Sequence, residues 1–372
     1  MAKIDDIQKE AHWHWDTARR RSNTLEMCTG SGKSKVAIDI VTNELLFGKY
    51  SEFKVLLLVP TRKLRDNNWR EEFNKWGHKD FYYKHVQTEC YATAYKFKDH
   101  YYDFVIADEI HNSLSENYSE FYKNNGFRFL LGLSATVDYD DVRPIAPVCF
   151  TYTLDQGIED GVISPYRLHI LEHKLEERIA NIRAGSKSYG FWMQTEVGAY
   201  KYKTKRISRS GNKKFARLDR MRFLWTLKSK IDPCKKILKK LKEEGKRVVL
   251  FSGSKDMIDL LTPHGMHSGK TDKENDEVYD AFNSKDISII GSAKKLKEGH
   301  NLTEVDAIVI VSYSSSELDF VQRLGRGLRY SPNKQADVYI FKTKGTQEED
   351  WFNKMSKGMD FSHATTVKTA NL

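Results

Sequence analysis

The segment at residues 27–34 reads MCTGSGKS and has the composition of a loop that wraps phosphate groups. Gly30 and Gly32 allow backbone angles that residues with a Cβ resist, so consecutive N–H groups can point at one anion. Lys33 would reach the β- and γ-phosphates of a nucleotide, and the Ser34 hydroxyl would bind Mg²⁺. The strict motif has glycine six residues before the lysine, where this chain has methionine. The loop therefore predicts a site for a nucleoside triphosphate with Mg²⁺.

A pair of carboxylates follows an apolar run further along the chain. The run from Phe104 to Ala107 predicts a buried strand, and Asp108 and Glu109 come directly after it. Adjacent acids at such a position are costly unless a cation is nearby. We therefore expect Asp108 to hold the Mg²⁺ shell and Glu109 to polarise the water that attacks the terminal phosphate.

Short apolar runs recur along the chain and predict buried parallel strands. They lie at 54–59, 102–107, 129–133, 166–171, 247–251, 287–290, 307–311 and 337–341. Helix-compatible segments separate them, at 3–20, 35–40, 64–76, 232–244, 272–284 and 346–360. In parallel sheets of this kind, ligand contacts gather at the carboxyl ends of the strands. Thr61 and Arg62 follow one such strand, and Ser134 and Thr136 follow another.

The composition limits the class of protein. The chain has 372 residues, of which 40% are hydrophobic and 30% are charged, so it can form two domains with full cores. No stretch approaches the roughly 18–20 apolar residues that a membrane span needs, and the first residues lack the apolar core of a signal peptide. The four cysteines are widely spaced, which excludes a paired-cysteine zinc ribbon and disfavours a disulfide framework. We expect a reducing compartment.

Positive charge is concentrated in one part of the sequence. The whole chain carries a net charge of +10, but residues 201–247 contain 19 Lys and Arg against 4 Asp and Glu. This block favours a surface that binds a polyanion, although a helix with a solvated basic face accounts for 235–241. Aromatic residues mix with Lys and Arg over 189–214, which suits stacking on unpaired bases. A small subdomain with a basic loop fits these residues equally well.

Five motifs stand in a fixed order. They are the loop at 27–34, Pro-Thr-Arg at 60–62, Asp-Glu-Ile-His at 108–111, Ser-Ala-Thr at 134–136, and Gln-Arg-x-Gly-Arg-x-x-Arg at 322–329. In these motifs the chain resembles a superfamily 2 DExH-box helicase. The likeness is strongest to type III restriction subunits and to phage DNA repair and replication helicases. It implies an α/β fold with two RecA-like parallel-sheet domains of the P-loop NTPase type in tandem, carrying a basic accessory insertion.

The resemblance also implies a division of the chain. We expect the first, ATP-binding domain at 1–150, a linker at 151–165, a basic and aromatic accessory segment at 166–225, the second domain at 226–360, and a tail at 361–372. ATP would lie between the two domains, and arginines of the second domain would stabilise charge on its γ-phosphate.

Site residues follow from the matched motifs. The resemblance implies catalytic roles for Lys33, Asp108, Glu109, Gln322, Arg326 and Arg329. It implies ATP contacts by Gln8, Thr29, Gly30, Ser31, Gly32, Lys33, Ser34, Gly299 and Asn301, with Mg²⁺ on Ser34 and Asp108. It implies coupling of hydrolysis to movement by His111, Ser134, Thr136 and Arg323. Nucleic-acid contacts are expected from Thr61, Arg62, Ser252, Ser292, Trp192, Arg206 and Lys213.

Some of these assignments have alternatives. Gln8 could be an exposed helix residue instead of an adenine contact, since Asp5 stands where the family often has arginine. Asn301 replaces an acid of the family motif, so its ribose contact is in question. His111 could simply cap the following helix.

The predicted function is an ATP-dependent DNA helicase that unwinds or remodels duplex or branched DNA in replication, recombination or repair. The cofactors are ATP and Mg²⁺. DNA is the expected partner, single-stranded or forked, with a single-strand-binding protein or other replication or repair factors beside it and no membrane. The expected place is a bacterial cell or the cytoplasm of a phage-infected host. The alternatives are a duplex DNA translocase that does not separate strands, an RNA helicase, and a nucleotide-gated nucleic-acid-binding protein with little turnover.

Overall fold

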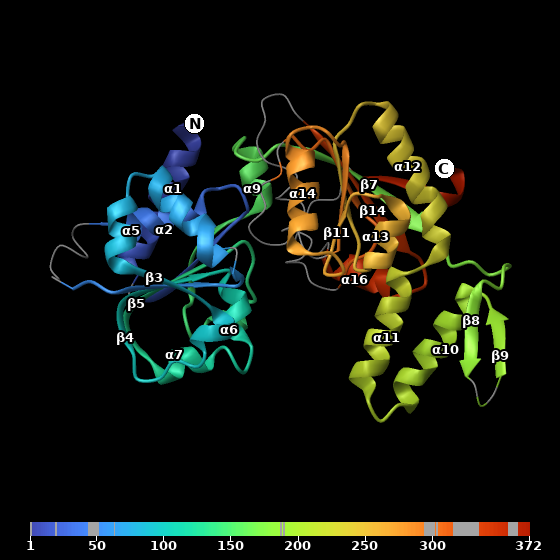
Figure 1. Ribbon diagram of the computed structural model, residues 1–372, viewed down its shortest axis with the longest axis horizontal. Coiled ribbons are helices and arrows are strands. Elements are labelled where there is room, and N and C mark those ends of the chain that lie inside the picture. Colours follow the sequence, from blue (N-terminus) through green and yellow to red (C-terminus); the bar gives the residue numbers. More distant parts are fainter. Residues whose placement is uncertain are drawn as a thin grey trace. The chain divides into compact units, whose positions relative to one another are not determined.

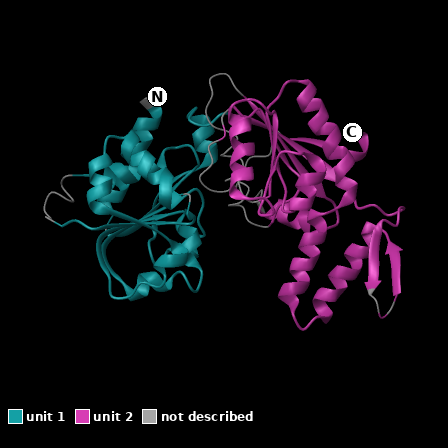
Figure 2. Cartoon of the chain, in the orientation of Figure 1, with its two compact units in different colours: residues 1–164, 298–301 teal, residues 165–297, 302–372 magenta. Residues whose placement is uncertain are grey.

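The chain forms two compact α/β units, and the boundary in the sequence falls between Ser164 and Pro165 (Figure 2). The computed structural model describes residues 2–18, 21–43, 52–62, 64–186, 188, 190–293, 302, 304–314, 335–355 and 364–372. Unit 1 contains the described residues through Ser164, and unit 2 contains those from Pro165 onward.

Unit 1 is built around a six-stranded parallel sheet with the order β3-β2-β4-β5-β1-β6. The strands are β1 (Ser22–Met27), β2 (Val55–Val59), β3 (Val86–Cys90), β4 (Tyr101–Asp108), β5 (Gly126–Ser134) and β6 (Val148–Tyr152). Every residue of β2 is buried, as the continuous apolar run predicts for a parallel strand with both faces covered.

One helix of unit 1 precedes the first strand, one follows the last, and the others lie in the connections between strands (Figure 1). The helices are α1 (Ala2–Thr17), α2 (Lys33–Val41), α4 (Trp69–Lys75), α5 (Lys79–His85), α6 (Tyr91–Ala94), α7 (Glu120–Asn124), α8 (Tyr139–Val142) and α9 (Leu154–Glu159). The segment expected as one helix at 64–76 differs from expectation, because a π-helical stretch, Leu64–Asn68, precedes α4. A 3₁₀ turn, Ile110–Leu114, follows β4.

Unit 2 is built around a seven-stranded parallel sheet with the order β11-β12-β10-β13-β14-β7-β15. Its strands are β7 (Tyr166–His173), β10 (Val248–Phe251), β11 (Gly265–Met266), β12 (Ile289–Ser292), β13 (Ala307–Ile310), β14 (Ala336–Thr343) and β15 (Thr365–Lys368). Its helices are α12 (Ile231–Glu243), α13 (Lys255–Leu261), α14 (Asp272–Asn283) and α16 (Gln347–Met355), with 3₁₀ turns at Lys228–Lys230 and Thr369–Asn371.

An insertion follows β7 and extends from the sheet of unit 2 (Figure 1). It consists of an antiparallel hairpin, β8 (Ile182–Ser186) and β9 (Gly190–Gln194), and a pair of packed helices, α10 (Glu196–Arg209) and α11 (Lys213–Trp225). We call residues 182–225 the arm. Asn212 caps α11 by accepting a hydrogen bond from Phe215 N at 2.9 Å, which allows the tight turn between the helices.

The observed elements divide the chain differently from the expected boundaries. β7 belongs to the sheet of unit 2, although 166–225 was expected to be one accessory segment. The expected tail at 361–372 contributes β15, which pairs with β7. The expected linker at 151–165 contains the end of β6 and all of α9, within unit 1. The unit to which each of these segments belongs is set by backbone pairing with strands that are distant in the sequence. Local composition does not reveal that pairing. Within the described residues, no helix is long and apolar enough to span a membrane.

Candidate nucleotide site and nucleic-acid interface

The phosphate loop joins β1 to α2 in unit 1. Gly30 has φ +91° and Gly32 has φ +85°, so both need the left-handed conformation that glycine adopts without strain. α2 begins at Lys33 directly after Gly32, which places the unpaired N–H groups of a helix start at the loop. The Lys33 ammonium donates to Met27 O at 2.8 Å and to Cys28 O at 3.4 Å. The Ser31 hydroxyl donates to Cys28 O at 2.7 Å.

Gln8 of α1 lies against this loop. Its Nε2 donates to Ser31 O at 3.2 Å, and its side chain is buried. A Cβ added to Gly32 would meet the amide nitrogen of Gln8, so a side chain at residue 32 would displace the glutamine from its place against the loop. The structure therefore does not leave Gln8 exposed on its helix, and its contact with adenine stays a prediction.

Strand register brings the two carboxylates predicted to be catalytic to the edge where the phosphate loop begins. Asp108 at the end of β4 pairs with Leu133 of β5, and Leu133 pairs with Leu25 of β1, two residues before that strand ends. Asp108 Oδ2 accepts a hydrogen bond from Trp69 Nε1 at 2.9 Å, and Asp108 O accepts one from the Tyr91 hydroxyl at 2.9 Å. Sequence reasoning missed both partners, because no local pattern marks an indole or a phenol as the support of a carboxylate.

Glu109 connects two of the motifs through a chain of polar contacts. His111 Nδ1 lies 3.6 Å from Glu109 Oε2 and 2.9 Å from the Ser134 hydroxyl. That hydroxyl donates to Thr136 O at 2.7 Å. Glu109 itself has φ +49° and ψ 56°, a conformation that costs a residue with a Cβ energy and that occurs often at functional sites. His111 thus bridges motifs instead of merely capping a helix.

Three threonine hydroxyls at this strand-end edge have no hydrogen-bond partner among the described residues. They belong to Thr29, Thr61 and Thr136, and each Oγ1 is buried. A buried hydroxyl without a partner carries a desolvation cost, so these atoms fit a site that a ligand completes. Arg62, beside Thr61, is exposed.

The donor set fits Mg²⁺ bound together with phosphates. The Ser34 hydroxyl and the Asp108 carboxylate are hard oxygen ligands, which Mg²⁺ prefers, and Mg²⁺ commonly takes the rest of its shell from phosphates and water. No group of three or more His, Cys, Asp or Glu suited to hold a metal occurs among the residues that the structure describes. Burial raises the pKa of the Cys28 thiol to about 11 despite the nearby Lys33 charge, so the loop does not offer a thiolate ligand at neutral pH.

In unit 2, the two serines expected to contact nucleic acid are buried. Ser252 N donates to Ser292 O at 3.1 Å, and the Ser252 hydroxyl shares a hydrogen bond of 3.0 Å with that of Ser312. These serines therefore form hydrogen bonds between neighbouring strand ends within the unit. Beside them lies a cavity of about 350 Å³. It is lined by Arg222, Trp225, Thr226, Gly253, Ser254, Lys255, Asp256, His267, Ser268 and Ala293. We call it the α11 pocket, and sequence reasoning did not find it.

The arm exposes aromatic and basic side chains. Trp192 on β9 is 53% exposed, and the neighbouring Phe191 ring has the Arg183 guanidinium 3.8 Å from its centroid. Arg206 on α10 contacts Asp219 Oδ2 at 3.3 Å, so its charge is partly compensated within the arm. Lys213 is exposed at the start of α11. Exposed rings beside cations suit stacking on unpaired bases, as the sequence predicted.

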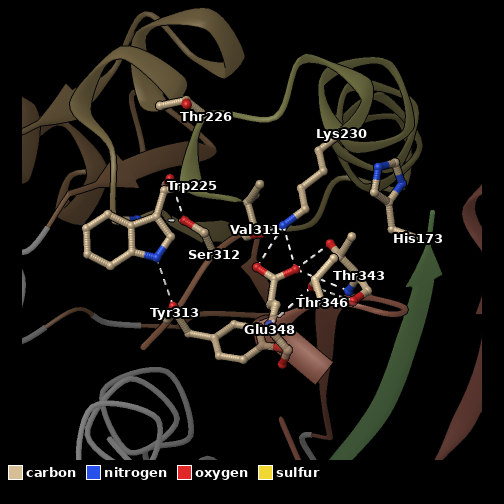
Figure 3. Close-up of polar contacts among 12 residues, drawn as sticks. His173, Trp225, Thr226, Lys230, Val311, Ser312, Tyr313, Thr343, Thr346 and Glu348 are labelled. Atoms are coloured by element: carbon tan, nitrogen blue, oxygen red, sulfur yellow. Dashed lines mark hydrogen bonds and ion pairs between the residues drawn. The ribbon is translucent and has the colours of Figure 1, made fainter. Parts of the chain in front are cut away.

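The segment that follows the arm is fixed to the core of unit 2 by a buried ion pair (Figure 3). The Lys230 ammonium donates to both carboxylate oxygens of Glu348 at 2.8 Å and to Val311 O at 3.0 Å. Glu348 Oε2 also accepts from Thr343 N at 3.1 Å and from the Thr343 hydroxyl. Both charged side chains are fully buried. Such a pair persists only when its remaining hydrogen-bonding capacity is met, as it is here.

A second buried carboxylate holds the start of α10. Glu196 accepts hydrogen bonds from Glu176 N at 3.0 Å, from Ser229 N at 3.1 Å and from the Ser229 hydroxyl at 2.6 Å. His173 of β7 contacts that same hydroxyl at 2.8 Å. Burial, and then the Lys230 charge, lower the pKa of His173 to about 3, so this imidazole is neutral near pH 7. The first turn of α10 and the segment that follows α11 are thus joined to one polar cluster.

The remaining predicted site residues lie outside the described residues. They are Gly299, Asn301, Gln322, Arg323, Arg326 and Arg329. Their nucleotide, catalytic and coupling roles stay predictions.

Two family models match the chain in the expected order. The type III restriction enzyme res subunit model matches residues 2–91, and the helicase conserved C-terminal domain model matches residues 229–331. Among known proteins, the chain is 24% identical over 380 residues to the DNA 3'-5' translocase XPB2 of Sulfurisphaera tokodaii, covering 93% of this chain and 83% of that protein. It is 29% identical over 140 residues to human chromodomain-helicase-DNA-binding protein 1, which is 34% of this chain but 8% of that protein.

Solved structures share the fold. The type ISP restriction-modification enzyme LlaBIII bound to DNA matches 99% of this chain with a TM-score of 0.61 and 14% identity, and this chain covers 31% of that enzyme. Dbp5 of S. cerevisiae bound to RNA and ADP BeF3 matches 98% of this chain and 90% of that one, with a TM-score of 0.61 and 12% identity.

The chain belongs to the superfamily 2 helicases, with two RecA-like domains. Within that class, the matches support an NTP-driven nucleic-acid motor of the helicase and translocase type. The family predicted from the motif order is confirmed, and so is the fold class of two parallel-sheet α/β domains.

Proposed function

We propose that this chain is an ATP-dependent DNA helicase that translocates on DNA and unwinds or remodels forked and branched duplexes. One observation carries the proposal. The chain of contacts from Glu109 through His111 to Ser134 and Thr136 links a carboxylate suited to orient water with the Ser-Ala-Thr segment, at the strand-end edge where the phosphate loop begins. Any rearrangement at Glu109 that accompanies hydrolysis reaches Ser134 through a single side chain.

The residues of unit 1 divide the work of hydrolysis. In the proposed cycle Lys33 exchanges its contacts with Met27 O and Cys28 O for phosphate oxygens. Asp108, held by Trp69, and Ser34 hold Mg²⁺, which when bound neutralises charge on the phosphates. Glu109 orients the attacking water and takes its proton. Nucleotide binding can drive movement only because it favours one conformation over another, and His111 is well placed to transmit that preference.

The nucleic-acid contacts proposed for this motor are of the backbone-tracking kind. Thr61 and Arg62 lie at the strand-end edge of unit 1, while Arg222 and Lys255 line the α11 pocket at the corresponding edge of unit 2. Contacts of cations and hydroxyls with phosphates fix position without reading sequence, so binding should depend on salt more than on sequence. We propose DNA as the substrate instead of RNA for two reasons. The motif has the DExH form, and the chain is similar to a DNA translocase.

A parallel activity assay tests the proposal. ATP-dependent phosphate release is measured with single-stranded DNA, duplex DNA, forked DNA and RNA, and strand displacement is measured from 3′ and 5′ overhangs. DNA should stimulate release, forked DNA should be unwound, and Glu109→Gln should abolish both activities. Absence of stimulation by any nucleic acid would reject the motor, and stimulation by RNA alone would reject DNA as the substrate.

A duplex translocase is the second candidate, and one finding favours it. The relative that matches 93% of this chain is named a DNA 3'-5' translocase. Displacement of a triplex-forming strand from blunt duplex DNA, without separation of the duplex itself, would favour this candidate. Unwinding of a fork would favour the helicase.

A further inference from the structure

A second cavity lies at the base of the arm, on the α10 side. Its volume is about 610 Å³. Its lining residues are Lys174, Leu175, Glu177, Val197, Tyr200, Lys201, Thr204, Lys205, Lys344 and Gly345. We call it the α10 pocket. Four of these residues are lysines and one is an acid, so the cavity has an excess of positive charge. Neither the motifs nor the family comparisons assign it a role.

The lysines of the α10 pocket are available to a ligand. Lys201 and Lys205 stand four residues apart on α10, which places them on one face of the helix. No carboxylate of the described residues pairs with Lys174, Lys201 or Lys205, whereas Lys344 already contacts Glu172 Oε1 at 3.0 Å. Three unpaired ammonium groups around one cavity suit an anion that carries several charges. Lysine ammonium groups bind phosphates as point charges, without the planar geometry that arginine imposes.

The floor of the α10 pocket is apolar and its aromatic ring is fixed. Leu175, Val197 and Tyr200 form the apolar part of the lining. The Tyr200 oxygen accepts a hydrogen bond from Gln347 N at 2.6 Å, and the Arg220 guanidinium lies 5.7 Å from the ring centroid. The ring is therefore engaged by the protein from two directions. The pocket suits a charged backbone with sugar groups against its floor better than a base stacked on a free ring.

The two pockets lie on the two sides of the arm's base. The α10 pocket adjoins the carboxyl ends of β7 and β14, through Lys174 and Lys344. The α11 pocket adjoins the ends of β10 and β12, through Gly253 and Ala293. All these strands are parallel, and β13 separates the two pairs, so both pockets open at one edge of one sheet. α10 lines the first pocket, and α11 lines the second.

We propose that the α10 pocket binds the phosphodiester backbone of the second DNA strand at a fork, so that the arm stands between the two strands. The inference rests on the proposed helicase function and names the substrate on which the arm acts. One strand follows the α11 pocket, and the displaced strand enters the α10 pocket. Exposed Trp192 and Phe191 lie on the same arm. Glu196 in the first turn of α10 is bound by Ser229, and the neighbouring Lys230 forms the buried pair with Glu348, so the arm's base is held in place as a wedge requires.

The test compares three DNA substrates that share one duplex. They are a fork with two single-stranded arms, the same duplex with only the 3′ arm, and the same duplex with only the 5′ arm. Binding of fluorescein-labelled DNA is followed by anisotropy. The wild-type chain should bind the fork more tightly than either single overhang. Lys201→Ala/Lys205→Ala should weaken fork binding about 10-fold, to the level of the better single overhang, and leave that overhang unchanged.

Salt dependence and a matched variant sharpen the test. Loss of two phosphate contacts with a single strand should make the fall of log binding constant with log salt concentration less steep for the fork, by about 1.4 in the slope. Lys235→Ala/Lys239→Ala removes the same charge at the same spacing from the exposed face of α12, and it should bind all three DNAs as the wild type does. Thermal unfolding of both variants verifies that they are folded.

Three results of the DNA-binding comparison would overturn the inference. They are unchanged fork binding by Lys201→Ala/Lys205→Ala, equal weakening on all three DNAs, and weakening matched by the α12 variant. Binding of an acidic peptide that is lost in Lys201→Ala/Lys205→Ala while fork binding persists would also overturn it and make the pocket a protein-docking site. Failure of the helicase proposal shows itself separately, as absent ATPase stimulation and unwinding in the wild type.

Discussion

The phosphate-loop edge of unit 1 and the polar cluster at the base of the arm in unit 2 differ in how their buried polar groups are satisfied. We call this cluster, which contains His173, Glu196, Ser229, Lys230 and Glu348, the arm anchor. At the edge, the hydroxyls of Thr29, Thr61 and Thr136 lack partners among the described residues, and Glu109 has a strained backbone. In the anchor, the Lys230–Glu348 pair is fully buried, and each member has further hydrogen bonds. Both regions cluster charge at strand ends, yet only one leaves hydrogen-bonding capacity unused.

The difference separates a site for ligands from a structural joint. Unsatisfied buried groups are destabilising by themselves and become favourable when a ligand completes them. A satisfied buried pair adds little net stability but makes the loss of either partner costly, so it holds one geometry. On this comparison, changes at the unit 1 edge should alter activity with small effects on stability, and changes in the anchor should do the reverse.

The largest effect on activity is expected at Glu109. Glu109→Gln removes the carboxylate that takes a proton from the attacking water, so ATP turnover should fall by about 10²–10⁴-fold. Nucleotide binding should persist, because Lys33 and the loop are unchanged. Phosphate release and titration with a fluorescent ATP analogue measure the two properties, and Glu116→Gln at an exposed position is the control. Normal turnover in Glu109→Gln would remove this residue from the active site.

The largest effect on stability is expected at Lys230. Lys230→Met leaves the buried Glu348 carboxylate without its cation, which should lower the free energy of unfolding by about 3–5 kcal/mol. Lys230→Met/Glu348→Gln should recover most of that loss, since glutamine still offers an oxygen to Thr343. Lys239→Met breaks an exposed pair and should cost less than about 1 kcal/mol. Urea unfolding measures all three, and equal losses in the single and double variants would contradict the role of the pair.

His173 should make the anchor sensitive to acid. Its folded-state pKa of about 3 lies below the ordinary value of 6.5, so the unfolded chain binds the proton more readily. The stability from this residue is complete above about pH 6.5 and is lost as pH falls from there toward 3, by about 1.4 kcal/mol per pH unit. His173→Gln should remove that part of the slope. Urea unfolding between pH 6.5 and 5 tests this, and an identical slope in the variant would refute it.

The smallest effect is expected at Gln8. If Gln8 contacts adenine, Gln8→Ala loses one hydrogen-bonding side chain, worth about 1 kcal/mol, and the preference for ATP over GTP should fall about 5-fold. Lys9→Ala on the same helix is exposed and should retain the preference. Competition of ATP and GTP for a fluorescent nucleotide measures it. An unchanged preference would show that Gln8 does not contact adenine and serves only to contact Ser31.

Sequence reasoning succeeded where a residue's role depends on its own strand. Runs such as 55–59 are wholly apolar, so their burial follows from composition alone, and the motifs at their ends follow from topology. β1 escaped notice because Asn23, Thr24 and Glu26 interrupt its apolar pattern. The structure buries them because distant groups satisfy them: Ala146 O accepts from the Thr24 hydroxyl at 2.6 Å, and Glu26 accepts from the Tyr139 hydroxyl at 2.7 Å.

The arm and its anchor could not be predicted for a similar reason. Lys230 and Glu348 are 118 residues apart, so no local pattern indicates that they pair. Lys201 and Lys205 suggested polyanion binding, but only the fold, which brings α10 near the segments that follow β7 and β14, collects them around a cavity with Lys174. Ser252 and Ser292 were expected to contact nucleic acid, and strand-end packing buries them. In each case the missing information is a contact between segments distant in the sequence.

The pairing of β7 has a consequence for the order in which the chain folds. Its two neighbours, β14 and β15, begin at residues 336 and 365, while β7 ends at residue 173. During synthesis at about 5–20 residues per second, β7 therefore waits roughly ten seconds or more for a partner strand. Unit 1 draws all six of its strands from residues 22–152, so it can finish folding during that wait. The arm emerges in the same interval, before the segment that carries Glu348 exists to lock its base.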